Sequence, residues 1–389
     1  MKKQITHRWL LYVIGVLAFA LSWGDISFAT TNNADMPATA TENVSVDETQ
    51  DSTEVENDTT VEGVQDGSTD SGQKDGWNDQ HNMYYVDGKP VVGVYNIDDK
   101  LYLFKNDGTQ YKKKGLRQVE GNYYYLNKDY SLKTGVVNVK GKCYYFQKVN
   151  GIRYEKKGIR KVDGKYYCFA SDYRLKSGWK RNAKGARYYF DKNTLAAKVG
   201  WKYVGQYKYY FKKNGQLMQD VRNQLTKKQK KDYLIRVNRT ACCVTIYAKD
   251  GKKGYTIPVV AFICSTGGPT PTGTFSIKSR MRWHTLFGPC WGQWCEHIVD
   301  NILFHSVPYL RPNDNRSLDV KEYNKLGTMA SHGCIRLKAG DAKWIYDNCK
   351  TGTKVIIYNN DKNPGPFDKP KLKKIKASHT WDPTDPNIK

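Results

Sequence analysis

A cysteine lies beside a glycine and a histidine in Ser331-His332-Gly333-Cys334-Ile335-Arg336, and a second histidine, His305, lies upstream in the apolar run 302–307. A thiol is a strong nucleophile only as a thiolate, so it needs a nearby base or positive charge. A histidine can supply either. Gly333 lets the backbone approach a substrate closely, and consecutive N–H groups at such a turn can hold a developing oxyanion. The pattern predicts acyl transfer through a thioester.

These residues resemble the YkuD family of L,D-transpeptidases, which cross-link peptidoglycan. The family pattern is a histidine on a strand, a gap, and then Ser/Thr-His-Gly-Cys, as in His305-Ser306 and Ser331 to Cys334. Its upstream Thr-Pro-x-Gly-x-Phe turn is matched by Thr270 to Phe275. The resemblance covers roughly residues 232–358. The gap after His305 is longer than is usual in the family, as if 308–325 carried an insertion that alters the substrate groove.

The resemblance implies roles for the residues of the motif. Cys334 is the nucleophile, and His305 is the base that activates the thiol and then protonates the leaving amine. The backbone carbonyl of Ser306 is expected to orient the His305 imidazole. His332 is the rival base by proximity. We favour His305, because a side chain two positions from the nucleophile often points elsewhere.

Other residues of the turn have expected roles as well. The N–H groups of Gly333 and Cys334 are predicted oxyanion donors, and Ser331 is expected to form hydrogen bonds within the turn. Arg336 can hold a substrate carboxylate, with a surface ion pair as the alternative. His305, His332 and Cys334 could in principle ligate zinc, but no carboxylate completes the set at a recognisable spacing, and a zinc-bound Cys334 would be a poor nucleophile. We therefore expect no metal and no cofactor.

The elements that position these residues are predicted to be mainly β, with a short helix. Strands are expected from Tyr233 to Cys264 around a turn at 249–252, with a closing strand at 354–358. The apolar spacing of Ala342, Ile345, Tyr346 and Cys349 predicts the helix. Residues 279–300 are expected to be a flexible aromatic loop over a groove, or a small satellite core around their tryptophans. The Pro- and Lys-rich tail 359–389 is expected to be unstructured.

A repeat precedes this domain, over residues 77–220. Glycines recur every 20 to 23 residues, each followed by a turn and an aromatic run, and they are found at positions 93, 115, 135, 158, 178 and 200. This pattern predicts a solenoid of stacked β-hairpins, with a partial first unit at 84–90. Residues 221–231 form a polar junction to the catalytic domain.

The array resembles the choline- and glucan-binding repeats of Gram-positive surface proteins. Choline modules hold a quaternary ammonium in aromatic cages by cation–π attraction. Only Trp179 and Trp201 are taken to keep the cage tryptophan, so these two are the candidate ligand sites, and most other aromatics are expected to form the solenoid core. We expect the repeats to anchor the protein to cell-wall polymers, with the ligand open.

Residues 1–29 are typical of a secretory signal, with basic residues before an apolar stretch and a small-x-small cleavage site at 27–29. An uncleaved anchor is the alternative, and it would give weak or transient membrane association. Residues 30–76 are an acidic linker rich in Thr, Ser, Asp and Glu, with too little apolar surface to fold. The expected location is therefore secreted and associated with the wall of a Gram-positive type envelope.

The net charge of +25 is unevenly distributed: residues 1–76 carry −9, and the remaining residues carry +34. In an exported protein the available polyanions belong to the wall and the lipid surface, so no nucleic-acid partner is expected. The lysines can also serve solubility alone. Nine cysteines permit pairs plus a free thiol, and Cys290 with Cys295 could close a small loop. An environment that keeps thiols reduced is the alternative.

The sequence as a whole predicts a secreted L,D-transpeptidase acting on peptidoglycan stem peptides. If water replaces the acceptor amine, the enzyme is an L,D-carboxypeptidase. The alternative from another class is a wall-binding surface protein whose catalytic domain is vestigial.

Overall fold

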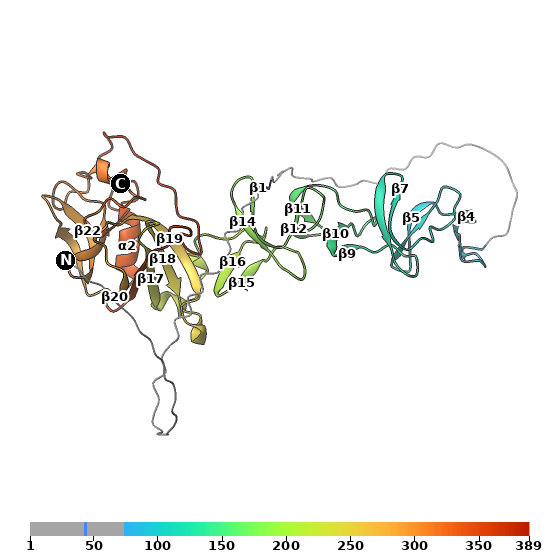
Figure 1. Ribbon diagram of the computed structural model, residues 1–389, viewed down its shortest axis with the longest axis horizontal. Coiled ribbons are helices and arrows are strands. Elements are labelled where there is room, and N and C mark those ends of the chain that lie inside the picture. The colour runs from blue at the N-terminus through green and yellow to red at the C-terminus, as the bar shows by residue number, and fades with distance from the viewer. Residues whose placement is uncertain (1–42, 45–73, 389) are drawn as a thin grey trace, which may run out of the picture. The chain divides into compact units, whose positions relative to one another are not determined.

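This computed structural model describes residues 43–44 and 74–388 (Figure 1). The predicted signal segment and nearly all of the predicted linker lie outside the described residues. Two linker residues form a short strand, β1 (Asn43–Val44), which pairs in parallel with β13 (Gly178–Asn182). In the ranges described, no helix is long and apolar enough to cross a membrane.

The N-terminal region consists of successive antiparallel hairpins, as predicted. Each predicted glycine begins the first strand of a hairpin with a positive φ, between 69° and 93°, a conformation that a residue with a Cβ rarely adopts. The hairpins are β5 (Gly93–Ile97) with β6 (Lys100–Phe104), β7 (Gly115–Val119) with β8 (Asn122–Leu126), β9 (Gly135–Val139) with β10 (Lys142–Phe146), β11 (Gly158–Val162) with β12 (Lys165–Phe169), β13 with β14 (Arg187–Phe190), and β15 (Gly200–Val204) with β16 (Tyr207–Phe211).

The first unit is longer than the sequence pattern indicated. A strand β2 (Gly76–Trp77) pairs with β3 (Tyr84–Val86), which forms a hairpin with β4 (Lys89–Pro90). The unit therefore begins with a Gly-Trp pair, like those at β13 and β15, which the sequence analysis overlooked.

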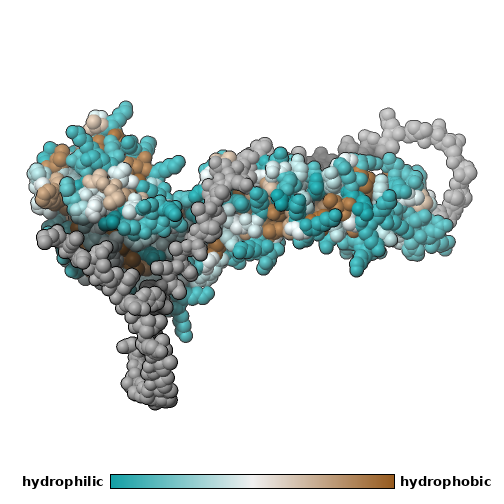
Figure 2. Space-filling model, in the orientation of Figure 1, coloured by the Kyte–Doolittle hydropathy of each residue, from teal (hydrophilic) through white to brown (hydrophobic). Residues whose placement is uncertain are grey.

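The hairpins stack through backbone hydrogen bonds from the segment that follows one hairpin to a strand of the preceding one. Leu132 N–H donates to Leu101 O at 2.6 Å, and Leu175 N–H donates to Cys143 O at 2.8 Å. The inward aromatics are buried, Phe146, Phe190 and Phe211 completely. Figure 2 shows that the visible face of the repeats is largely hydrophilic. The tyrosine runs thus serve mainly as solenoid core.

The C-terminal domain is built on a curled sheet of nine strands, in the order β20-β25-β17-β18-β19-β24-β23-β22-β21. One half holds β17 (Tyr233–Asn238), β18 (Cys243–Ala248), β19 (Ile257–Ser265), β20 (Gly273–Ser276) and β25 (Lys354–Tyr358); the other holds β21 (Ser279–Thr285), β22 (Trp291–Val299), β23 (Ile302–Ser306) and β24 (Ile335–Leu337). Short 3₁₀ turns lie at η1 (Arg222–Gln224), η2 (Gln229–Lys231) and η3 (Gly251–Lys253).

Helix α2 (Ala339–Asn348) packs against the sheet through the face that the sequence predicted. Ala342, Ile345 and Cys349 are buried in the main core, and Tyr346 packs against it. Only Lys338 separates β24 from α2, and Cys334 directly precedes β24.

Residues 279–300 are not a flexible loop, which corrects one expectation. They form the β21–β22 hairpin, in which Trp294 is buried in the main core and Trp283 packs on a smaller cluster. Only residues 286–290 connect the strands. Two of the three tryptophans in this range therefore serve packing, as in the alternative expectation that they fill a core.

The prediction of an unstructured tail is also wrong. After β25 the chain forms no helix or strand, but it packs across the domain. Phe367 is buried, and Lys369 Nζ donates to Gly327 O at 2.8 Å. Leu372 and Ile375 pack with the segment 308–325, which contains the short helix α1 (Val320–Tyr323). Local composition suggested disorder because the few apolar residues of the tail show no periodicity.

All nine cysteines lie in the described part of the chain, and each is a free thiol. The small loop that a Cys290–Cys295 bond would close is therefore absent. Six of the nine are buried: Cys168, Cys242, Cys243, Cys264, Cys295 and Cys349.

Candidate active site

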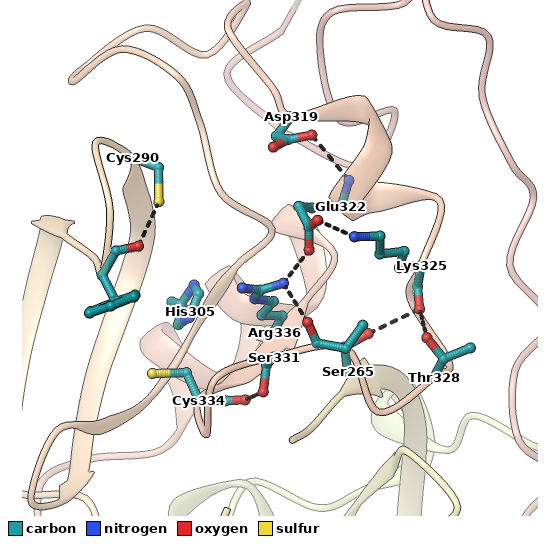
Figure 3. A network of polar contacts seen from close by, with 12 residues as sticks. Ser265, Cys290, His305, Asp319, Glu322, Lys325, Thr328, Ser331, Cys334 and Arg336 are labelled. Carbon is teal, nitrogen blue, oxygen red and sulfur yellow. Dashed lines mark hydrogen bonds and ion pairs between the residues drawn. The ribbon is translucent and has the colours of Figure 1, made fainter. Parts of the chain in front are cut away.

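Strand pairing brings His305 close to Cys334. Strands β23 and β24 are parallel neighbours, with His305 opposite Arg336, and Cys334 directly precedes β24. Both side chains line one cavity of about 830 Å³, and Figure 3 shows the thiol and the imidazole in this cavity. The cavity is also lined by Met281, His284, Phe287, Cys290, His297, Asn301, His332 and Arg336.

His305 is held as a neutral base. Its side chain is buried, and this burial together with the nearby charge of Arg336 lowers the pKa of the imidazole to about 3, against the raising effect of the bond to Ser306. The ring Nδ1 lies 2.5 Å from the carbonyl oxygen of Ser306. A carbonyl only accepts, so Nδ1 carries the proton and Nε2 keeps its lone pair. This is the orientation predicted for the Ser306 carbonyl.

Cys334 is partly buried, and burial raises the pKa of its thiol. Two neighbours act in the opposite direction: the backbone N–H of Leu303 donates to the sulfur, and Arg336 contributes positive charge. The thiol itself lies 3.5 Å from the carbonyl oxygen of Asn301. Neither the lowered pKa of His305 nor the raised pKa of Cys334 favours a preformed thiolate–imidazolium pair.

The turn that carries Cys334 is closed by Ser331, as predicted. Its hydroxyl donates to the Cys334 carbonyl oxygen at 2.6 Å and accepts from the Gly333 N–H at 3.2 Å. Gly333 has φ +132°, and an added Cβ would lie 2.7 Å from Ile302 Cδ1. The Gly333 N–H is thus engaged within the turn, so its predicted role as oxyanion donor requires it to leave Ser331.

The segment from Thr266 to Thr270 supports this turn from behind. Thr270, fully buried, donates its hydroxyl to Gly333 O at 2.7 Å and accepts from Gly267 N at 2.8 Å. Ser331 N–H donates to Thr266 O at 2.9 Å. Thr270, the first residue of the Thr-Pro-x-Gly-x-Phe turn, therefore supports the loop that carries Cys334.

Arg336 lines the cavity and forms an ion pair with Glu322 of α1 (Figure 3). It also donates to Ala330 O at 3.2 Å. The pair is largely buried, with 11% and 20% of the two side chains exposed, so it is not a surface ion pair. The segment 308–325 thereby supplies the ion-pair partner of an arginine that lines the cavity, and recognition of a substrate carboxylate by Arg336 stays a prediction.

His332 is exposed, in contrast to His305. Its ring packs on the exposed Phe287 of the β21–β22 connection, with ring centroids 5.4 Å apart. This placement favours His305 as the base. In the part of the chain that the structure describes, no cluster of three or more His, Cys, Asp or Glu side chains is placed to hold a metal ion.

Gly292 of β22 is a site residue that the sequence analysis missed. A Cβ at this position would lie 3.1 Å from His305 Nδ1 and 3.1 Å from Cys295 Sγ. These distances are tighter than ordinary contacts, so the glycine leaves the space in which the imidazole is seated. Only its proximity in the fold reveals this, because Gly292 has no motif around it.

The two candidate ligand tryptophans of the repeats lie against other parts of the protein. The guanidinium of Arg187 lies 4.4 Å from the Trp179 ring centroid, beside Tyr189 and Tyr209. Trp201 packs against the core of the catalytic domain. Both positions argue against the predicted role. Trp77 has the same edge-on contacts with two tyrosines, Tyr84 and Tyr102, as Trp179 has.

Comparison with solved structures finds similar chains of two kinds. Choline binding protein F from Streptococcus pneumoniae is 25% identical, with a TM-score of 0.27, over 37% of this chain and 52% of that one. An L,D-transpeptidase from Mycobacterium smegmatis is 21% identical, with a TM-score of 0.26, over 33% of this chain and 58% of that one.

Comparison with protein families and curated proteins bears on the C-terminal domain. Residues 232–357 match the model described as YkuD, L,D-transpeptidase catalytic domain. The Bacillus subtilis (strain 168) protein named "Putative L,D-transpeptidase YciB" is 39% identical over 119 residues, 28% of this chain and 59% of that protein. The chain thus spans about three fifths of this relative. Residues 232–357, which hold Cys334 and His305 in one cavity, are thus similar in sequence to the L,D-transpeptidase catalytic domain of the YkuD family.

Proposed function

We propose that the protein is an exported, wall-associated L,D-transpeptidase that cross-links peptidoglycan stem peptides through a thioester on Cys334. One observation carries the proposal: Cys334 lines the same cavity as His305, whose neutral Nε2 is left free by the bond from Nδ1 to Ser306 O. The family of the domain supports a peptidoglycan-related substrate.

In the first half-reaction the Cys334 sulfur attacks the carbonyl of a bond between an L-centre and D-Ala. His305 takes the thiol proton and then gives it to the leaving amine of D-Ala. In the second half-reaction an acceptor amine attacks the thioester, the S–C bond breaks, and the proton of the amine returns through His305 to the sulfur. Water in place of the amine gives L,D-carboxypeptidase activity.

The test uses purified protein with a tetrapeptide stem donor and a stem acceptor that carries a side-chain amine. Mass spectrometry of the products should show D-Ala release and a cross-linked dimer, and both should be lost in Cys334→Ala. Release without a dimer would identify a carboxypeptidase. Turnover that persists in Cys334→Ala would refute the assignment, and an inactive wild type that still binds walls would leave the vestigial-domain alternative.

The export and wall association of the protein are part of the proposal. The signal-like segment 1–29 supports export, and the basic repeats support attraction to anionic wall polymers. Fractionation of cells should recover the protein with the wall, and recovery in the cytoplasm would contradict this part.

A further inference from the structure

The strand that carries His305 is incompletely paired on the side of β22. The ladder pairs Glu296 with Phe304, but Trp294 has a left-handed φ of 48°. Beyond this irregularity, the backbone N–H of Gln293 donates to the hydroxyl of Ser306 at 2.9 Å. The side chain of Ser306 thus replaces a backbone acceptor, and the carbonyl of the same residue orients His305.

Gln293 is in turn held by the C-terminal tail. Its side chain is fully buried, and Nε2 donates to Asp385 Oδ2 at 2.8 Å. Tyr309, also buried, directs its hydroxyl to the same oxygen at 3.3 Å. Asp385 is 4% exposed, and its other oxygen accepts from the Asn387 N–H at 2.9 Å. Arg282 of β21 is the nearby cation, since Asp385 raises its pKa against the lowering effect of burial.

We propose that Asp385 is a positioning residue for the catalytic histidine: it fixes Gln293, which fixes Ser306, whose carbonyl fixes His305. The inference rests on the proposed function of His305. It assigns a part in the chemistry to a segment outside the residues that match the catalytic domain family, 232–357.

A buried carboxylate in this place is not explained by packing alone. Transferring a carboxylate out of water is costly unless it is hydrogen-bonded, and a buried amide left without a partner is costly as well. Asp385 Oδ2 accepts the Gln293 Nε2 bond, whereas Gln293 Oε1 is buried without a partner, so the bond to Asp385 is what fixes the orientation of this amide beside Ser306. Removing either partner would free the other to seek new contacts and shift the imidazole.

The same tail provides a matched control. Asp382 is fully buried and accepts from the Ala339 N–H at 2.7 Å, at the start of α2. Thr384 accepts from the Gly340 N–H at 2.9 Å. These two residues cap α2, whose own N-cap residue, Lys338, makes no side-chain cap bond. Asp382 is thus a tail carboxylate of similar burial whose side-chain bonds go to the start of α2 and to Thr384, not to Gln293.

The experiment measures alkylation of Cys334 by iodoacetamide in the full chain, followed by mass spectrometry of the Cys334 peptide at about pH 7 and about pH 10. Near pH 7 the rate depends on His305; near pH 10 the thiol ionises without its help. Asp385→Ala should lower the ratio of the two rates roughly 10- to 100-fold, the range that small misplacements of catalytic groups produce. Gln293→Leu should lower it equally, and the double variant should be no lower than either single variant.

The controls separate positioning from stability. Asp385→Asn keeps an acceptor for Gln293 and should restore the ratio. Asp382→Asn should lower the melting temperature and leave the ratio unchanged. A ratio like that of the wild type in both Asp385→Ala and Gln293→Leu would overturn this inference alone. A wild-type rate near pH 7 equal to that of His305→Ala would overturn the assignment of the base, and the inference with it.

Discussion

At the scale of single residues, the site pairs a neutral imidazole with a neutral thiol. Burial lowers the pKa of His305 to about 3 and raises the pKa of Cys334. A preformed thiolate–imidazolium pair would need the opposite shifts. On the proposed function, His305 is therefore a general base that accepts the proton as the sulfur attacks, and Leu303 N–H and Arg336, which lower the pKa of the thiol, favour negative charge on sulfur.

This ionisation predicts the acid side of the pH profile. An ordinary histidine, with pKa about 6.5, would lose half its base function at that pH. Because the pKa of His305 is lowered, it stays neutral as pH falls, and the rate of Cys334 acylation should stay level from neutral pH down to about pH 5. Stopped-flow measurement of the acylation rate between pH 7 and about pH 5 tests this prediction. An inflection of the rate near pH 6.5 would contradict it.

A second residue-scale prediction separates the two histidines. His305→Ala should lower the neutral-pH alkylation rate of Cys334 by about 100-fold, the lower end of what a general base contributes. His332→Ala is the matched control, because its ring is exposed and packs on Phe287. It should leave the rate within about twofold. If His332→Ala lowers the rate and His305→Ala does not, His332 is the base instead of His305.

At the scale of elements, the nucleophile turn depends on the chain that packs behind it. Adjacent glycines of that segment differ sharply: a Cβ at Gly267 would lie 2.0 Å from Ser331 O, whereas one at Gly268 meets nothing within 4 Å. Neither has a positive φ. The pair thus isolates steric support of the turn from any change in backbone freedom.

Gly267→Ala should displace the turn and lower acylation at least tenfold, with a loss of stability of about 1–3 kcal/mol, as overpacking typically costs. Gly268→Ala should match the wild type in both. Acylation kinetics and thermal unfolding measure the two effects. Equal activity in the two variants would show that the turn does not need its support from Gly267.

Thr270 tests the polar part of the same support. Thr270→Val removes the hydroxyl that bridges Gly267 N and Gly333 O and leaves both buried groups without it. We expect a loss of about 1–3 kcal/mol and slower acylation. Thr270→Ser keeps the hydroxyl and should recover most of both. If Thr270→Val and Thr270→Ser have the same stability and acylation rate, the hydroxyl does not support the turn.

At the scale of the whole molecule, the tail joins parts that are distant in sequence. Asp368 forms an ion pair with Arg181 and accepts from Gln219 Nε2 at 2.7 Å. Arg187, over Trp179, donates to Pro366 O at 2.9 Å. The aromatic group at Trp179 thus has the protein's own Arg187 over its ring and lies at this joint, so we propose the basic residues of the repeats as the contact with the wall.

The repeats should therefore bind walls mainly by charge. Binding of the full chain to purified walls should weaken as salt rises, because exposed charges are screened beyond ~10 Å at 0.1 M. Free choline at constant ionic strength should elute little. Complete elution by choline would show that aromatic choline-binding cages exist despite the missing tryptophans. Trp77 would then be the first residue to substitute. Binding insensitive to salt would point to stacking of the tyrosine runs on glycan.

Local patterns in the sequence were enough to find the hairpins, most strands of the catalytic sheet, helix α2 and the pair Cys334 and His305. They are short-range signals: a glycine period, an apolar alternation, a contiguous motif. Gly292 and Asp385 gave no such signal, because their importance arises from contacts with His305 and Gln293 across the fold. The composition of the tail suggested disorder because it does not reveal that the buried Asp382 and Asp385 accept hydrogen bonds from groups elsewhere in the fold.

The central claim is that Cys334 is the nucleophile, and one measurement tests it most directly. Purified protein is mixed with a carbapenem near neutral pH, and intact mass and peptide mapping locate the acyl group. We expect one adduct per chain, on Cys334. It should form more slowly in His305→Ala and be absent in Cys334→Ala. An adduct that persists in Cys334→Ala, or that maps to Cys290 in the same cavity, would contradict it.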